Sequence, residues 1–219
     1  MRPKFTEEKK ESVKASIVPK ALDLFYQKGI PDVAMMDIAE KCSIGIATLY
    51  RYFKEKKAIV IPSGTLLWNR KKEEFEKIYG QGIKSGKDGY GILKNLYSYF
   101  LELFEKEPEF FRFLADFDAF LLREKPEEQE MDAYDSVLGE IKDVFHKAVT
   151  RGQEDGSVRK DIDFGPTYYS FSKALLGLGE KLSMKKDLLK SDREADKEKQ
   201  METMLKAVLE YLKGTLIGA

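Results

Sequence analysis

Hydroxyl and basic side chains gather between residues 46 and 57, in the order Ile-Ala-Thr-Leu-Tyr-Arg-Tyr-Phe-Lys-Glu-Lys-Lys. Lysine, arginine, tyrosine and threonine are side chains that contact DNA phosphates, and threonine and arginine also reach the edges of bases. Within residues 41–57 there are five basic residues and one acidic residue. The stretch therefore predicts a surface that binds double-stranded DNA.

Two short helices joined by a tight turn would position these side chains. Ile38 and Ala39 give the first helix an apolar and small contact surface. Leu49 and Phe53 lie four residues apart on one face of the second helix, and Ile44 fills the turn between the helices. This pattern is typical of a helix-turn-helix, in which the opposite face of the second helix is free to meet DNA.

The candidate DNA-contacting residues lie on that second helix or just after it. They are Ile46, Ala47, Thr48, Tyr50, Arg51, Tyr52, Lys54, Lys56 and Lys57.

Three blocks at a specific spacing resemble the N-terminal domain of the tetracycline-repressor (TetR) family of bacterial transcription regulators. The first is Ala21-Leu-Asp-Leu-Phe25 with Lys28-Gly29 after it, the second is Asp37-Ile-Ala39, and the third is Thr48-Leu-Tyr-Arg-Tyr-Phe-Lys-Glu-Lys56. The resemblance covers residues 10–60. It implies three N-terminal helices for DNA, followed by a helical domain that binds a ligand and forms a homodimer.

The resemblance also implies roles for single residues. Tyr50, Tyr52 and Lys56 match phosphate-contacting positions of the family. Thr48 can serve a phosphate or a base, and Arg51 can reach either a guanine or a phosphate. A homodimer would present two such helices to successive major grooves, so the DNA site should be roughly palindromic.

The sequence departs from the family pattern at several positions of the motif. Ala34 stands where the family has a threonine or serine that caps the first motif helix, and alanine cannot accept that hydrogen bond. Ser43 stands in place of the turn glycine. Ile46 and Ala47 lie at the start of the second helix, where contact with a thymine methyl group is expected. These differences mean that DNA sequences known for the family do not transfer to this chain.

Length and composition favour two domains. With 219 residues and 42% apolar residues, the chain can bury one sizeable core and a small second one. Residues 1–57 carry 12 basic and 8 acidic residues, so the N-terminal segment is positive although the whole chain has no net charge. We expect a DNA-binding domain over residues 1–57 and a ligand-binding and dimerisation domain over 58–219.

Apolar residues recur at helical spacing along almost the whole chain, which predicts an all-α fold of about nine helices. Pro19 and Pro62 fall inside predicted helices, where each would kink or interrupt the helix. Five glycines predict a loop after a connecting helix that runs from residue 56 to about 79. They are Gly80, Gly82, Gly86, Gly89 and Gly91.

The last two predicted helices carry apolar and small residues that would suit a dimer interface, although the same stripes could face the core of their own chain. The resemblance favours the dimer. The predicted interface residues are Leu175, Leu178, Leu182, Met201, Met204, Leu205, Val208 and Leu212.

Aromatic residues of the second domain could line a pocket for an apolar or aromatic effector. Each of them could equally be ordinary core, and the single histidine, His146, could anchor a polar group of a ligand or face solvent. The candidate ligand-binding residues are Trp68, Tyr97, Phe100, Phe113, Phe117, Tyr134, Phe145 and Tyr168.

Other classes of function find little support. One histidine and one cysteine, Cys42, exclude the usual zinc clusters and disfavour a histidine-assisted nucleophile, so we expect no catalytic residues, metal ligands or cofactor. The chain lacks an apolar run of about 20 residues and a signal sequence, so we expect a cytoplasmic protein without a membrane partner.

The sequence thus predicts a ligand-responsive transcriptional regulator, by family default a repressor that a small effector releases from its operator. The alternative is a dimeric helical adaptor whose helix-turn-helix contacts protein or binds DNA without sequence preference. Steep salt dependence together with a palindromic preference would separate the two.

Overall fold

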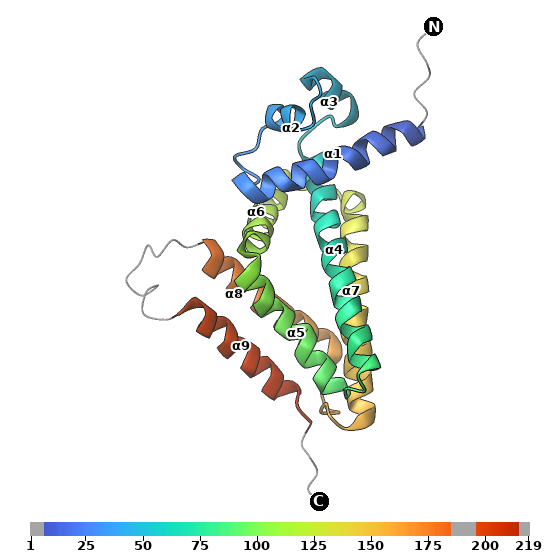
Figure 1. The fold of residues 1–219 in the computed structure, drawn as a ribbon, viewed down its shortest axis with the longest axis vertical. Helices are drawn as coiled ribbons and strands as arrows, with labels where there is room; N and C mark the ends of the chain where they lie inside the picture. Colours follow the sequence, from blue (N-terminus) through green and yellow to red (C-terminus); the bar gives the residue numbers. More distant parts are fainter. Residues whose placement is uncertain (1–6, 185–195, 215–219) are drawn as a thin grey trace, which may run out of the picture. The chain divides into compact units, whose positions relative to one another are not determined.

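The prediction of an all-α fold with about nine helices is confirmed. A computed structural model describes residues 7–184 and 196–214, and these residues form nine α-helices (Figure 1). In chain order the helices are α1 (Glu7–Lys28), α2 (Met35–Lys41), α3 (Ile46–Tyr52), α4 (Lys57–Lys84), α5 (Gly89–Lys106), α6 (Pro108–Glu124), α7 (Glu128–Asp155), α8 (Phe164–Met184) and α9 (Lys197–Leu212).

The glycine-rich loop was predicted too long. Gly80 and Gly82 lie inside α4, and Gly89 and Gly91 lie in the first turn of α5, so only Gly86 is in the connection, with φ +70°. A Cβ atom on Gly82 would lie 2.7 Å from the side chain of Ile92. Glycine therefore serves here to let two helices approach closely, a role that a sequence pattern does not separate from a turn.

Neither internal proline interrupts its helix. α1 continues through Pro19 and α4 continues through Pro62. Each proline removes one backbone hydrogen bond, but the neighbouring turns and the packing of the helix keep the helical conformation.

The chain folds into two compact units, Met1–Arg70 with Arg112–Val137, and Lys71–Phe111 with Leu138–Ala219. Three helices, α4, α6 and α7, contribute residues to both units. In α4 the boundary between the two compact units lies after residue 70, whereas the domain boundary predicted from the sequence lies after residue 57. The functional division into residues 1–57 and 58–219 stays a prediction.

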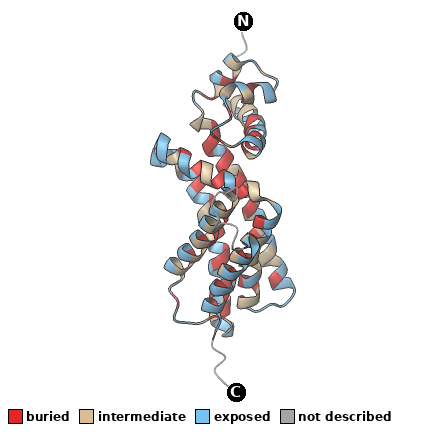
Figure 2. Cartoon of the chain, turned by 90° about the vertical axis from the view of Figure 1, so that its left-hand side faces the viewer, coloured by how far each residue is buried: buried red, intermediate tan, exposed pale blue. Residues whose placement is uncertain are grey.

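In the first unit, α1 packs on α2 and α2 on α3. Each of these helices carries both buried and exposed residues (Figure 2). Leu22 and Phe25 of α1, Ile38 of α2 and Leu49 of α3 are almost completely buried. Their burial fixes the arrangement of the three N-terminal helices.

In the second unit, α5 packs against both α8 and α9, and α8 packs against α9. Rings fill its interior: Phe75 lies 5.4 Å from Phe145, and Tyr97 lies 4.9 Å from Phe145, measured between ring centroids. A Cβ atom on Gly179 would lie 2.3 Å from the ring of Phe111, so glycine is needed where this ring meets the backbone of α8.

Candidate nucleic-acid interface

The residues that were predicted to hold the helix-turn-helix together do so. Ile38, Ala39, Leu49 and Phe53 are buried, and Ile44 is half-buried in the turn. Leu49 is the buried residue of α3, and the other residues of this helix keep accessible surface.

The turn between α2 and α3 has the hydrogen bonds of a Schellman motif. The Ser43 N–H donates to the Glu40 carbonyl at 2.9 Å, and the Ile44 N–H donates to the Ala39 carbonyl at 3.0 Å. Ser43 has φ +56°, the left-handed conformation that glycine adopts most readily. The family's glycine position is thus a true left-handed position in this chain, occupied by a strained serine.

The start of α2 is capped from within the helix. Ala34 is the N-cap residue and provides no side-chain hydrogen bond, as expected. Instead, its backbone N–H donates to Oδ2 of Asp37 at 2.7 Å. This hydrogen bond, aided by Lys28 3.6 Å from the other carboxylate oxygen, holds the pKa of Asp37 below its usual value.

The outer face of α3 combines apolar, hydroxyl and cationic groups. Ala47, Tyr50 and Arg51 are exposed, and Ile46, Thr48 and Tyr52 are half-buried. Tyr50 exposes 48% of its surface, and the Arg51 guanidinium lies 5.2 Å from the centroid of the Tyr52 ring. All six residues therefore have groups that a DNA duplex could reach.

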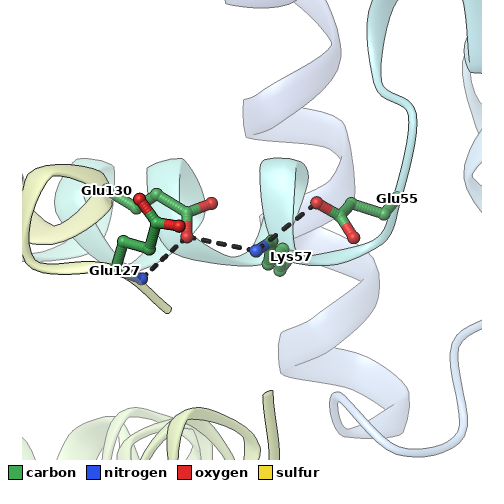
Figure 3. Close-up of polar contacts among 4 residues, drawn as sticks. All are labelled: Glu55, Lys57, Glu127 and Glu130. Atoms are coloured by element: carbon green, nitrogen blue, oxygen red, sulfur yellow. Dashed lines mark hydrogen bonds and ion pairs between the residues drawn. The ribbon is translucent and has the colours of Figure 1, made fainter. Parts of the chain in front are cut away.

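The three candidate lysines after α3 differ in their surroundings. Lys54 is exposed and has no ion pair within the part of the chain that the structure describes. Lys57 lies between two carboxylates, at 3.5 Å from Glu55 and 3.1 Å from Glu130 (Figure 3). Lys56 donates through Nζ to the carbonyl oxygen of Ile30. Of these three lysines, Lys54 alone is exposed without an ion pair to a described residue.

Two carboxylates that the sequence did not single out accept hydrogen bonds from Ile30 and Lys57, which flank the helix-turn-helix. Oδ2 of Asp116 in α6 accepts a hydrogen bond from the Ile30 N–H at 2.9 Å. Oε2 of Glu130 in α7 accepts from Lys57 and also from the Glu127 N–H at 2.9 Å. Both lie far from the motif in sequence and resemble ordinary surface acids there, so no sequence signal could have identified them.

The eight candidate ligand-binding residues are all buried, but they form two clusters, one in each compact unit. In the first unit, Phe117 stacks on Phe113 at 5.8 Å and on Tyr134 at 5.0 Å. The Trp68 indole Nε1–H donates to the Tyr134 hydroxyl at 2.9 Å. The residues that were predicted to line one ligand pocket thus lie in two clusters.

The second cluster contains Tyr97, Phe100, Phe145 and Tyr168. Phe145 lies at its centre, 4.9 Å from Tyr97, 5.3 Å from Tyr168 and 6.5 Å from Phe100 between ring centroids. Burial raises the pKa of Tyr168 to about 12 and also raises the pKa of Tyr97, so both phenols stay neutral at ordinary pH.

His146 lies outside both clusters. It is exposed on α7, stacks on Phe164 with ring centroids 4.5 Å apart, and borders a shallow hollow of about 330 Å³ on the surface of the second unit. The hollow is lined by Tyr79, His146, Lys147, Thr150, Arg151 and Glu154.

The predicted dimer-interface residues fall into two groups that differ in burial. Five of them are buried inside their own chain, which is the alternative that the sequence left open: Leu175, Met201, Leu205, Val208 and Leu212. Leu178, Leu182 and Met204 are only half-buried and keep apolar surface accessible.

Two properties of the described residues bear on other classes of function. No group of three or more His, Cys, Asp or Glu side chains in that part of the chain is arranged to hold a metal ion. Among the helices described here, none combines the length and the apolar character needed to cross a membrane.

Part of the chain matches a known protein family. Residues 17–61 match the model described as "Bacterial regulatory proteins, tetR family", and this segment contains the whole helix-turn-helix. A search of curated proteins finds no match to the chain.

Solved structures share the fold over nearly the full chain. The reduced form of Escherichia coli NemR has a TM-score of 0.68 at 13% identity, covering 94% of this chain and 100% of its own. Thermus thermophilus FadR, a TetR-family transcriptional repressor in complex with lauroyl-CoA, has a TM-score of 0.61 at 17% identity, covering 94% and 98%. RolR in complex with resorcinol has a TM-score of 0.63 at 15% identity, covering 94% and 90%.

These identities by themselves establish only a common fold, whereas the family model matches the sequence of the motif. The match shows that residues 17–61 carry the N-terminal domain of the tetR family of bacterial regulatory proteins, and the chain as a whole shares its fold with solved structures of TetR-family regulators.

Proposed function

We propose that this protein is a ligand-responsive transcriptional repressor that acts in the cytoplasm by binding rather than by catalysis, and that it binds a roughly palindromic operator as a homodimer. The observation that carries the proposal is the outer face of α3. Tyr50 and Arg51 are exposed there, and Lys54 follows with an unpaired charge within the described chain. Hydroxyl and cationic groups of this kind suit phosphates and base edges.

Within this proposal the residues have separate tasks. Tyr50, Tyr52 and Lys54 contact phosphates and set the register of the helix on the duplex. Ala47 and Thr48, near the start of α3, read base edges, with Ile46 beside them for a thymine methyl group. Substitutions at Ala47 or Thr48 should therefore change sequence preference, whereas phosphate contacts should affect all sequences alike.

Homodimerisation is supported by the apolar surface that α8 and α9 leave accessible. Leu178, Leu182 and Met204 are half-buried, and Ala174 on α8 is half-buried one turn before Leu178. A two-fold dimer through this surface would place two α3 helices in successive major grooves, about 34–36 Å apart.

An apolar or aromatic effector is supported by the relatives with bound ligands, one with lauroyl-CoA and one with resorcinol. In this chain the two aromatic clusters are the candidate sites. The cluster in the first unit has one built-in polar pair, the Trp68 indole and the Tyr134 hydroxyl, which an effector with a hydroxyl or carbonyl group could join.

The connecting helix α4 is the candidate element for transmitting effector binding, because it begins directly after the motif and continues into the second unit. Such a switch requires that the effector bind the DNA-competent and DNA-incompetent states with different affinity. Unchanged operator affinity with a bound ligand would exclude the switch for that ligand.

Selection of bound fragments from the source genome by purified protein, followed by sequencing, tests the proposal. We expect enrichment of a site with two similar half-sites about one helical turn apart. Salt-sensitive binding without enrichment of any sequence, or no binding even at low salt, would favour the adaptor instead.

A further inference from the structure

The backbone N–H and the backbone carbonyl of Ile30 are each hydrogen-bonded to a charged side chain. Its N–H donates to Oδ2 of Asp116 at 2.9 Å, and its carbonyl oxygen accepts from Nζ of Lys56. Ile30 itself is 1% exposed. Charged partners strengthen both hydrogen bonds compared with neutral ones.

Ile30 lies at one chain end of the helix-turn-helix, and Lys56 lies at the other. Ile30 follows the last turn of α1, and Lys56 immediately precedes α4. The hydrogen bond between them closes the segment that carries α2 and α3, and Asp116 attaches the closed segment to α6.

The backbone around Ile30 is shaped to receive the carboxylate. Gly29 has φ +86°, and its N–H donates to the Phe25 carbonyl at 2.8 Å at the end of α1. A Cβ atom on Gly29 would lie 2.9 Å from Oδ2 of Asp116. Close by, the rings of Tyr26 and Phe113 lie 5.8 Å apart between centroids, so α1 and α6 also share an apolar contact.

The environment of the Lys56 ammonium differs from that of a free phosphate-binding lysine. Burial is the main cause that lowers its pKa, the positive charge of Arg123 lowers it further, and Asp32, Asp37 and Glu124 act in the opposite direction. A phosphate would have to compete with the Ile30 carbonyl for an ammonium group that is already partly withdrawn from solvent.

From this geometry we propose that Lys56 and Asp116 are positioning residues that fix α3 relative to α6, and that Lys56 does not contact a DNA phosphate. The inference rests on the proposed DNA binding and corrects the role that family resemblance gives to Lys56. Loss of either side chain releases one of the two hydrogen bonds that hold the backbone of Ile30 and lets α3 move away from its DNA-competent orientation.

Salt dependence of DNA binding distinguishes positioning from phosphate contact. The variants are Lys56→Met, Asp116→Ala and their combination, with Lys54→Met as the control for a lost phosphate contact. DNA affinity is measured over a salt series with a bound genomic fragment, at a temperature where all variants are folded.

Lys54→Met should reduce the slope of log affinity against log salt by about one unit. Lys56→Met and Asp116→Ala should each weaken binding by about tenfold with the wild-type slope. The double variant should bind about as weakly as either single variant, because both side chains hold the backbone of the same residue, Ile30. A reduced slope for Lys56→Met, or losses that add in the double variant, would overturn the inference.

Hydrogen exchange of the Ile30 amide gives a readout that does not need DNA. We expect protection in the wild type and in Asp116→Asn, whose side-chain carbonyl can still accept the hydrogen bond. Asp116→Ala should lose that protection without loss of protection in α5. Equal exchange in the wild type and Asp116→Ala would refute the positioning contact whether or not the protein binds DNA, whereas absence of DNA binding with intact Ile30 protection would refute only the proposed function.

Discussion

The Lys57 ammonium is held between the carboxylates of Glu55 and Glu130, at 3.5 and 3.1 Å, at the point where α4 begins (Figure 3). Because its charge is compensated within the chain, Lys57 should contribute little to phosphate binding. We predict that Lys57→Gln changes the salt slope of DNA binding by clearly less than one unit, in contrast to the exposed Lys54. A slope change as large as that of Lys54→Gln would show that Lys57 leaves its carboxylates for DNA.

The same contacts predict an acid dependence of stability. The hydrogen bond from the Glu127 N–H, followed by that from Lys57, lowers the pKa of Glu130 in the folded state. A lowered folded pKa means that the stabilisation is present above the pKa of an unfolded glutamate, about 4.3, and is lost as the pH falls through the folded value. The difference in unfolding free energy between wild type and Glu130→Gln should therefore shrink between pH 6 and pH 3 in urea titrations. An unchanged difference would contradict the assignment.

The left-handed Ser43 offers a stabilising substitution. Glycine avoids the steric cost that a side chain has at φ +56°, although it also gains freedom in the unfolded chain. We expect Ser43→Gly to raise the unfolding free energy by about 0.5–1 kcal/mol, seen as a higher urea midpoint with an unchanged m-value. Ser43→Ala is the matched control, since alanine keeps the Cβ atom, and it should show no such gain.

The half-buried leucines of α8 predict how the dimer can be disrupted. Leu178→Gln should weaken self-association while the chain stays folded, because its side chain keeps accessible surface in the single chain. Leu122→Gln is the control, since this leucine is 78% exposed on α6. Sedimentation at several concentrations measures the result. A Leu178→Gln protein that remains as dimeric as Leu122→Gln would place the interface elsewhere.

The single tryptophan can locate the effector site. Trp68 is 4% exposed and belongs to the aromatic cluster of the first unit. An effector that binds this cluster should change the emission of Trp68, and Trp68→Phe should weaken its binding because the hydrogen bond to Tyr134 is lost. Tight binding measured by calorimetry, with no change in Trp68 emission, would favour the Tyr97, Phe145 and Tyr168 cluster.

The helix-turn-helix could be predicted because its determinants are local. Ile38, Ala39, Leu49 and Phe53 lie within 16 residues, and all four are buried. The contacts of Asp116 and Glu130 could not be predicted, since each bridges 70 or more positions and an isolated carboxylate carries no periodic pattern. Tertiary contacts also decided the role of Gly82, which allows Ile92 to approach and does not end a helix.

For the apolar residues of α8 and α9, the sequence does not identify the packing partner. An amphipathic pattern identifies an apolar face but does not say whether the partner is the same chain or a second copy. Leu175, Met201 and Val208 carry the same pattern as Leu178, yet the structure buries them within one chain. Only the arrangement of α5, α8 and α9 separates the two groups.

Recognition of a DNA sequence by the outer face of α3 can be measured directly. Purified wild-type protein and Thr48→Ala are titrated with the best-enriched genomic fragment and with a scrambled fragment of equal length and composition. We predict that the wild type prefers the enriched fragment by at least about a thousandfold at moderate salt and that Thr48→Ala reduces this preference. Equal affinity of the wild type for both fragments at every salt concentration would contradict the claim.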